Sequence, residues 1–155
     1  FSTFLGADGM LADEVIEQLG AENLTNATFT TSTSDESTPG YAAWKALATA
    51  ADLNPLGPFI PNSYDAAFMM ALAIEKAGSA DRDLIAGSLR AIANAPGEII
   101  LPGEWSKAKK ILAAGGDIHY NGGSGPQDFD ANGDVAGDFS ASVVQDGAWV
   151  GKIIK

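Results

Sequence analysis

The sequence predicts an α/β fold, and three observations support this prediction. Residues 2–34 carry a strand pattern, a helix pattern and a second strand pattern, the order typical of a βαβ unit. Helical patterns then dominate residues 38–115. The chain ends in two alternating runs around Asp146-Gly147, a dipeptide that strongly favours a hairpin turn. We therefore expect a βαβ start, a helical middle block and a C-terminal β-hairpin.

The βαβ unit begins with a short apolar run at residues 2–6 that ends in glycine, a pattern that favours a buried strand. Acidic residues fill the first turns of the predicted helix that follows, and Gly20 stands where a helix-ending glycine belongs. The apolar residues of this helix recur at helical spacing and are Met10 or Leu11, Val15 and Leu19. Residues 26–34 are β-branched and aromatic, so they form the second predicted strand.

The middle block opens with a helix that Thr38 can cap, with Pro39 at its first position. A second helix spans Asn62–Gly78 and is apolar around nearly its whole circumference between residues 66 and 74. A helix of this kind belongs in a core, so we expect it to be covered on most sides.

Two further helices complete the block. Ser79 or Asp81 caps the first of them, and the second is an amphipathic helix within residues 103–116. The terminal hairpin pairs residues 139–145 with residues 148–154.

Composition excludes several functions. The chain has 155 residues, no cysteine and a formal net charge of −11. Thiol catalysis, disulfides and Cys-ligated zinc are therefore excluded, and nucleic acid or an anionic membrane is disfavoured as a partner. No apolar run reaches the ~20 residues that a membrane-spanning helix needs. The single histidine, His119, lies in the Gly-rich stretch GGDIHYNGG, where we expect a solvated or capping role in a loop.

The Asp-rich segment DFDANGDVAGDF, residues 128–139, has two interpretations. Its oxygen-bearing residues at alternate positions are the candidate calcium ligands Asp128, Asp130, Asn132 and Asp134. An EF-hand loop also needs a bidentate Glu at position 12, and that position is Phe139. Because Asn132-Gly133 is in addition a strong turn dipeptide, a surface turn is the preferred interpretation.

Asp8 is the most informative candidate for a binding residue. It follows a predicted buried strand and precedes a helix, and ligands of open α/β sheets bind at the carboxyl ends of strands. A carboxylate in such a place suits a cationic group such as an ammonium. The alternative is a structural role at the helix N-terminus, and position alone leaves both open.

The sequence does not predict an enzyme. Ser124 lacks a nucleophile motif, and the stretch GGSGP around it lacks the lysine and spacing of a phosphate loop. The aromatic residues on predicted helices are expected in the core; these are Tyr41, Trp44, Tyr64 and Trp105.

Three stretches together resemble a known family. FLGADGMLADEVIEQLG, NSYDAAFMMALAIEKAGSADRDLIAGSLRAIAN and GGSGPQDFDANGDVAGDF resemble, in this order, the C-terminal portion of type I periplasmic binding proteins of ABC importers, of the Leu/Ile/Val type. The resemblance covers nearly the whole chain. It implies a two-lobed clamp in which residues 1–32 belong to the second lobe, residues 33–138 to the first lobe, and residues 139–155 return to the second.

The resemblance also implies functional roles. Asp8 would receive the α-ammonium of an amino acid in the interlobe cleft, and Tyr64 would be a neighbour of the hinge or cleft. The partner would be the membrane permease of an importer, the location periplasmic or, in a Gram-positive host, extracellular and membrane-anchored, with no cofactor. Two alternatives stay open: the same fold with another ligand (an amide, urea or an aromatic acid) or a sensor role, and a calcium-stabilised module built on Asp128–Asp134.

A final expectation concerns the extent of the chain. It starts at Phe1, so we expect that a targeting segment has been removed or that the chain is part of a longer protein. If it folds alone, its apolar helix Asn62–Gly78 lacks a covering sheet, and we expect self-association or exchange of elements between copies.

Overall fold

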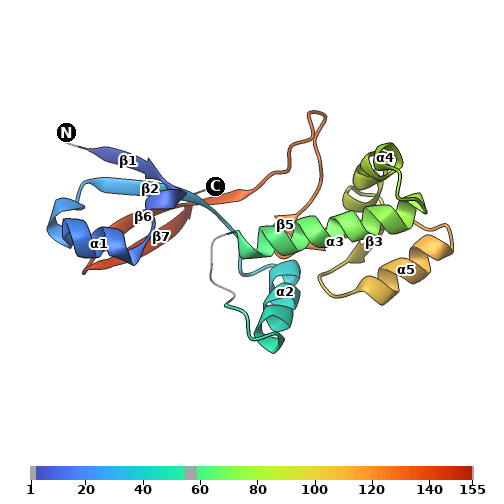
Figure 1. The fold of residues 1–155 in the computed structure, drawn as a ribbon, viewed down its shortest axis with the longest axis horizontal. Coiled ribbons are helices and arrows are strands. Elements are labelled where there is room, and N and C mark those ends of the chain that lie inside the picture. The colour runs from blue at the N-terminus through green and yellow to red at the C-terminus, as the bar shows by residue number, and fades with distance from the viewer. Residues whose placement is uncertain (1–2, 55–58, 155) are drawn as a thin grey trace. The chain divides into compact units, whose positions relative to one another are not determined.

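The computed structural model describes residues 3–54 and 59–154. Within these ranges the chain is a mixed α/β protein that divides into two compact units (Figure 1). Unit 1 comprises Phe1–Thr33 and Asp138–Lys155, and unit 2 comprises Ser34–Gly137. The assignment of residues 1–32, 33–138 and 139–155 to the lobes of a clamp stays a prediction.

Residues 3–33 and 138–154 of unit 1 form a four-stranded sheet, one α-helix and two short 3-10 helices. Its strands are β1 (Phe4–Ala7), β2 (Ala27–Thr33), β6 (Asp138–Gln145) and β7 (Ala148–Ile154), in the order β1-β2-β6-β7. β1 and β2 are parallel, and the other pairs are antiparallel. The short 3-10 helix η1 (Asp8–Met10), helix α1 (Asp13–Leu19) and the 3-10 helix η2 (Ala21–Asn23) connect β1 to β2. This is the predicted βαβ start followed by the predicted hairpin.

The core of unit 1 forms around Phe29. This residue is fully buried, and its ring meets that of Trp149 edge to face, with centroids 5.1 Å apart. The β6–β7 turn places Asp146 and Gly147 at φ angles of 50° and 79°. Two positive φ angles in a two-residue loop are the geometry that a tight hairpin requires, so the Asp-Gly signal identified the turn correctly.

The described residues of unit 2, which are 34–54 and 59–137, form four helices and a small sheet. The helices are α2 (Pro39–Ala50), α3 (Ile60–Ala77), α4 (Arg82–Ala93) and α5 (Trp105–Ala113), and the strands are β3 (Glu98–Ile100), β4 (Ile118–Gly122) and β5 (Gly125–Pro126). The sheet order is β3-β4-β5, with β3 and β4 parallel. Both predicted caps are confirmed, since the Thr38 side chain accepts a hydrogen bond from Tyr41 N and that of Asp81 accepts from Asp83 N and Leu84 N.

The sheet of unit 2 was missed by the sequence analysis. The expectation that His119 lies in a loop is wrong, because His119 is the second residue of β4. In this strand Ile118, Tyr120 and Gly122 are buried while the residues between them are half-buried. The flanking glycines concealed this alternation.

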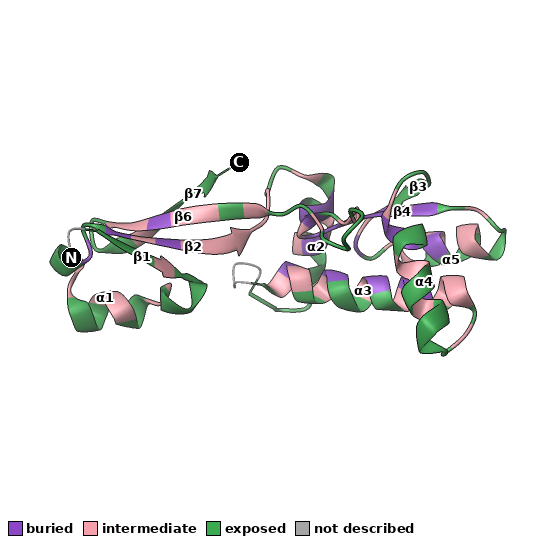
Figure 2. Ribbon diagram, turned by 90° about the horizontal axis from the view of Figure 1, so that it is seen from above, coloured by how far each residue is buried: buried purple, intermediate pink, exposed green. Residues whose placement is uncertain are grey.

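The expected burial of α3 on most sides is also wrong. One face packs into the core through Met69, Leu72 and Ala73, whereas Met70 and Ile74 are 47% and 42% exposed. Figure 2 shows this contrast as buried and exposed stretches along α3. In the described part of the chain no helix is long and apolar enough to cross a membrane.

Candidate functional site

Asp8 lies at the carboxyl end of β1, as the first residue of η1. Its side chain is exposed, and within residues 3–54 and 59–154 no hydrogen bond or ion pair holds the carboxylate. Helix α1 begins only at Asp13, with Ala12 at its N-cap, so Asp8 does not cap it. Asp8 is instead the acidic residue in the first turn of η1, and its role in binding stays a prediction.

Hydroxyl-bearing residues end the strand next to β1, because β1 and β2 are parallel. Ala7, the last residue of β1, is in register with Thr30 of β2. The last residues of β2 therefore extend beyond the end of β1, alongside the start of η1. These residues are Thr30, Thr31, Ser32 and Thr33, all of them half-buried. The carboxyl edge of this parallel pair thus offers an unpaired carboxylate and several hydroxyl groups, which can donate and accept hydrogen bonds. Sequence reasoning missed this hydroxyl set, although the run TFTTSTS could have signalled it.

Tyr64 occupies the first half of α3. Its hydroxyl accepts a 2.9 Å hydrogen bond from Gly103 N, in the loop that follows β3. Burial raises the pKa of the Tyr64 hydroxyl, and the Gly103 donor partly opposes this shift. The structure therefore gives Tyr64 a partner in unit 2, and its role beside a ligand stays a prediction.

Asp65 is a buried polar residue that sequence reasoning did not single out. It is 1% exposed, and its carboxylate accepts hydrogen bonds from Tyr120 Oη at 2.7 Å, Gly123 N at 2.9 Å, Ser124 N at 2.7 Å and Ser124 Oγ at 2.6 Å. A signal was present in the sequence, because Asp65 lies four residues before Met69 on the buried face of an apolar helix. A carboxylate on such a face must find donors, since its burial without them is costly.

The other aromatic residues behave as predicted. Tyr41 and Trp44 are 5% and 2% exposed and pack together in the core of unit 2. Trp105 is partly buried against the neighbouring core cluster.

The Asp-rich segment forms a turn held by its own aspartates. Asp130 Oδ1 accepts hydrogen bonds from the backbone N–H groups of Asn132, Gly133 and Asp134, at 2.8, 2.9 and 2.9 Å. These donors, with that of Asp134 first, lower the pKa of the Asp130 carboxyl. Phe129 and Val135 pair across the turn, as the turn interpretation requires.

Asp128 is engaged elsewhere. Its Oδ1 accepts from Ala95 N at 3.2 Å, and its Oδ2 lies 3.0 Å from His119 Nε2. The side chains of Asn132 and Asp134 are exposed. Within the described residues no group of three His, Cys, Asp or Glu side chains is arranged to hold a metal ion. The geometry of this segment supports the turn.

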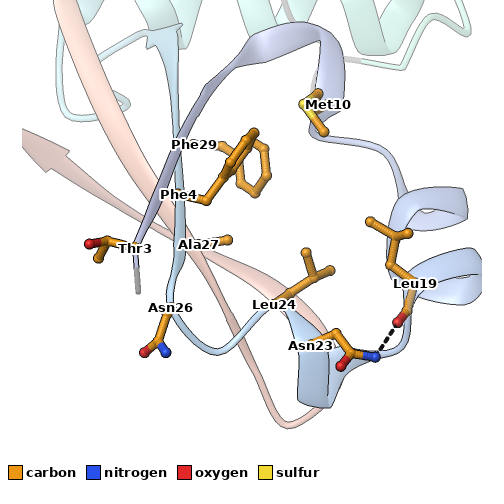
Figure 3. Close-up of a pocket in the computed structure, with 9 residues that line it drawn as sticks. All are labelled: Thr3, Phe4, Met10, Leu19, Asn23, Leu24, Asn26, Ala27 and Phe29. Carbon is orange, nitrogen blue, oxygen red and sulfur yellow. Dashed lines mark hydrogen bonds between the residues drawn. The ribbon is translucent and has the colours of Figure 1, made fainter. Parts of the chain in front are cut away.

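Unit 1 also contains an apolar cavity of about 440 Å³. It is lined by Thr3, Phe4, Met10, Leu19, Asn23, Leu24, Asn26, Ala27 and Phe29. Figure 3 shows the rings of Phe4 and Phe29 side by side at one end of this space, with Leu19 and Leu24 at the other. The cavity lies beside β1, whose Phe4 and Leu5 are 47% and 74% exposed.

Comparison with known proteins identifies the family. Residues 2–144 match the family model described as the receptor family ligand binding region. The chain belongs to this family.

Solved structures show the same fold. The leucine binding protein LivK of Thermotoga maritima is 26% identical and superposes with a TM-score of 0.63, over 99% of this chain and 38% of that one. The branched-chain amino acid transporter substrate binding protein LivJ of Streptococcus pneumoniae, solved with isoleucine, gives a TM-score of 0.59 at 18% identity, over 98% and 37% of the two chains. The type I periplasmic binding protein fold that the sequence predicted is therefore confirmed.

A third relative comes from a signalling system. The substrate-binding protein BasB of the chemotactic signal transduction system of Halobacterium salinarum is 33% identical over 107 residues, which are 68% of this chain and 25% of BasB. The chain thus spans only about a quarter to two-fifths of the length of these relatives. All three are named as binding proteins and none as an enzyme.

Proposed function

We propose that this chain is part of a solute-binding protein that delivers a branched-chain or related amino acid to the permease of an ABC importer. The observation that carries the proposal is the unpaired Asp8 carboxylate at the carboxyl end of β1. An exposed carboxylate can accept charge-assisted hydrogen bonds from the α-ammonium of an amino acid. The names of LivK and LivJ support an amino acid as the ligand.

In this proposal binding is coupled to closure of a clamp. The ligand favours the closed state only if it makes contacts there that the open state lacks, and Asp8 supplies one of them. Further contacts would come from the part of the relatives' length that this chain does not span. The permease would recognise the closed state, and the protein would act in the periplasm or, in a Gram-positive host, outside the cell on a membrane anchor.

A sensor role is the second candidate, because BasB is named as part of a chemotactic system. The same binding chemistry serves both roles, and only the membrane partner differs. Uptake of labelled leucine and movement toward leucine, each compared between cells with and without the gene, separate the two.

The binding proposal is tested by calorimetry on the intact protein that carries this chain. The probes are L-leucine, L-isoleucine and L-valine, with 4-methylpentanoate as the leucine analogue that lacks the ammonium group. Asp8→Asn should weaken leucine binding by about 10- to 100-fold, the cost of one charge-assisted hydrogen bond. The control is Glu17→Gln, an equally exposed acidic residue on α1, and it should bind like the wild type.

The analogue makes the test specific to Asp8. Wild-type protein should discriminate strongly between leucine and 4-methylpentanoate, and Asp8→Asn should lose most of that discrimination. Equal discrimination by both proteins would remove Asp8 from the ammonium site. Failure of the wild type to bind any of the three amino acids would overturn the proposed ligand class.

A further inference from the structure

We propose that Tyr64 and Asp65 form a positioning pair, which fixes the loops after β3 and β4 so that unit 2 presents one preformed surface for the ligand. This inference rests on the proposed function and deepens it. The two residues are consecutive on α3, so their side chains point about 100° apart and reach two different loops.

Asp65 holds the loop after β4. Two of its donors are the backbone N–H groups of Gly123 and Ser124, the residues that directly follow the strand. The Ser124 hydroxyl adds a third bond, and Gln127 Nε2 in turn donates to this hydroxyl at 3.0 Å. The loop is therefore tied to α3 by both its backbone and its side chain.

Tyr64 holds the loop after β3. Its hydroxyl accepts from Gly103 N, while a local turn closes through Leu101 N, which donates to Glu104 Oε2 at 2.8 Å. The Tyr64 ring is stacked on that of Phe68, with centroids 5.6 Å apart, and this contact limits its movement. The Tyr64 hydroxyl thus holds the backbone N–H of Gly103 in one position relative to α3.

Close packing also surrounds the β4 loop. A Cβ atom on Gly122 would collide with the Asp65 carboxylate, one on Gly40 with the carbonyl of Gly122, and one on Gly123 with the side chain of Trp44. Helix α2, helix α3 and the end of β4 therefore approach one another at van der Waals distance. A loop held in this way is preorganised rather than adaptable.

Two physical considerations favour positioning over simple stabilisation. The loops after β3 and β4 lie at the carboxyl ends of parallel strands, the edge where α/β sheets bind ligands. Buried hydrogen-bonded pairs also add little net stability, because replacing both partners by apolar groups of the same shape can be nearly neutral. A preformed binding surface, in contrast, binds more tightly because less conformational entropy is lost when the ligand binds.

The experiment combines amide hydrogen exchange with calorimetry, using L-leucine as the probe. The variants are Tyr64→Phe, which removes the acceptor for Gly103, and Ser124→Ala, which removes one donor to Asp65 without leaving a charge unpaired. Asp65→Asn is the more drastic variant and is used only if it folds. Asp81→Ala is the control, because it removes the α4 cap and lowers stability without touching either loop.

We expect exchange to become about tenfold faster at Gly103 in Tyr64→Phe and at Gly123 in Ser124→Ala. Leucine affinity should fall about tenfold in each, relative to Asp81→Ala at a matched loss of Tm. Faster exchange with unchanged affinity would overturn the positioning role, and unchanged exchange would show that the pair does not hold the loops. If wild-type protein fails to bind leucine, isoleucine and valine, the proposed function fails, and the exchange data alone then decide whether the loops are held.

Discussion

The hydroxyl of Tyr120 on β4 donates a 2.7 Å hydrogen bond to the Asp65 carboxylate on α3, and both side chains are almost completely buried. This bond joins β4, the central strand of the small sheet in unit 2, to helix α3. Tyr120→Phe removes the donor and leaves the carboxylate with one bond fewer in a site that water does not reach. We expect a loss of about 1.5–3 kcal/mol in the free energy of unfolding, the range for hydrogen bonds to charged groups. Urea denaturation measures it.

Tyr64→Phe is the matched comparison for this variant. It also removes one tyrosine hydroxyl from unit 2, but Tyr64 is only half-buried and its partner is a backbone N–H. Its loss of stability should stay within about 1 kcal/mol, the usual contribution of a neutral hydrogen bond. Equal losses in the two variants would mean that the charge of Asp65 does not strengthen the Tyr120 bond.

Alkaline pH should destabilise the protein through the same tyrosine. Burial raises the pKa of Tyr120, and the neighbouring Asp65 raises it further. Above pH ~10, the ordinary pKa of tyrosine, the unfolded chain loses this proton while the folded chain keeps it. The folded state then binds more protons than the unfolded state, so stability is fully present below pH ~10 and falls as the pH rises further.

Thermal unfolding between neutral pH and pH ~11 tests this dependence. Tm should fall more steeply above pH ~10 in the wild type than in Tyr120→Phe, because only the wild type carries the Tyr120 hydroxyl, whose pKa is raised. All other titratable groups are common to the two proteins, so the difference between the two curves isolates Tyr120. Parallel curves would contradict the assignment.

The limits of the sequence analysis are visible in these residues. Long patterns predicted α3 and the β6–β7 hairpin, and the Thr38 and Asp81 caps were recognised because capping depends on adjacent residues. Strand β3 has only three residues, too few for a periodicity, and the alternation in β4 is concealed by glycines. Short strands of this kind are defined by the partner with which they pair, and that partner is remote in sequence.

The residues of the candidate site could be predicted only in part, for a similar reason. Asp8 could be found because it directly follows a recognisable strand. The role of Asp65 depends on Gly123 and Ser124, which lie 58 and 59 residues further along the chain. A contact over this separation leaves no local pattern, and only the presence of a carboxylate on an apolar helix face indicates that donors must exist.

The Asp130 turn predicts a response to acid and to calcium. Asp130→Ala should lower Tm, because three backbone N–H groups lose their common acceptor. Backbone donors lower the pKa of this carboxyl, so its contribution is present above the ordinary aspartate value and is lost as the pH falls through the lowered one. The difference in Tm between wild type and Asp130→Ala should therefore shrink in strong acid.

Calcium should leave Tm unchanged relative to an equal concentration of magnesium, because Asp130 and Asp128 already accept bonds from backbone donors. A ligand that binds the native state must raise its stability. A rise in Tm that is specific to calcium, and is lost in Asp130→Ala, would restore the interpretation of residues 128–134 as a calcium loop.

The exposed face of α3 predicts self-association of the chain when it is isolated. Met70 and Ile74 lie four residues apart on this helix and are 47% and 42% exposed, so they form one apolar stripe. Burial of such a stripe against a second copy removes apolar surface from water and favours association. Sedimentation velocity of the isolated chain should therefore show a species larger than the 15.9 kDa monomer.

Met70→Lys tests whether this stripe is responsible. The substitution places a charge in the stripe, so the larger species should dissociate, while stability should change by no more than about 0.5 kcal/mol because the site is exposed. Leu84→Lys on α4 is the control, since Leu84 is 55% exposed and lies on a different helix. Dissociation by Leu84→Lys but not by Met70→Lys would place the interface on α4. A wild-type chain that is monomeric at all concentrations would contradict the prediction. It would mean that the free energy gained by burying Met70 and Ile74 is smaller than the entropy lost when two chains associate.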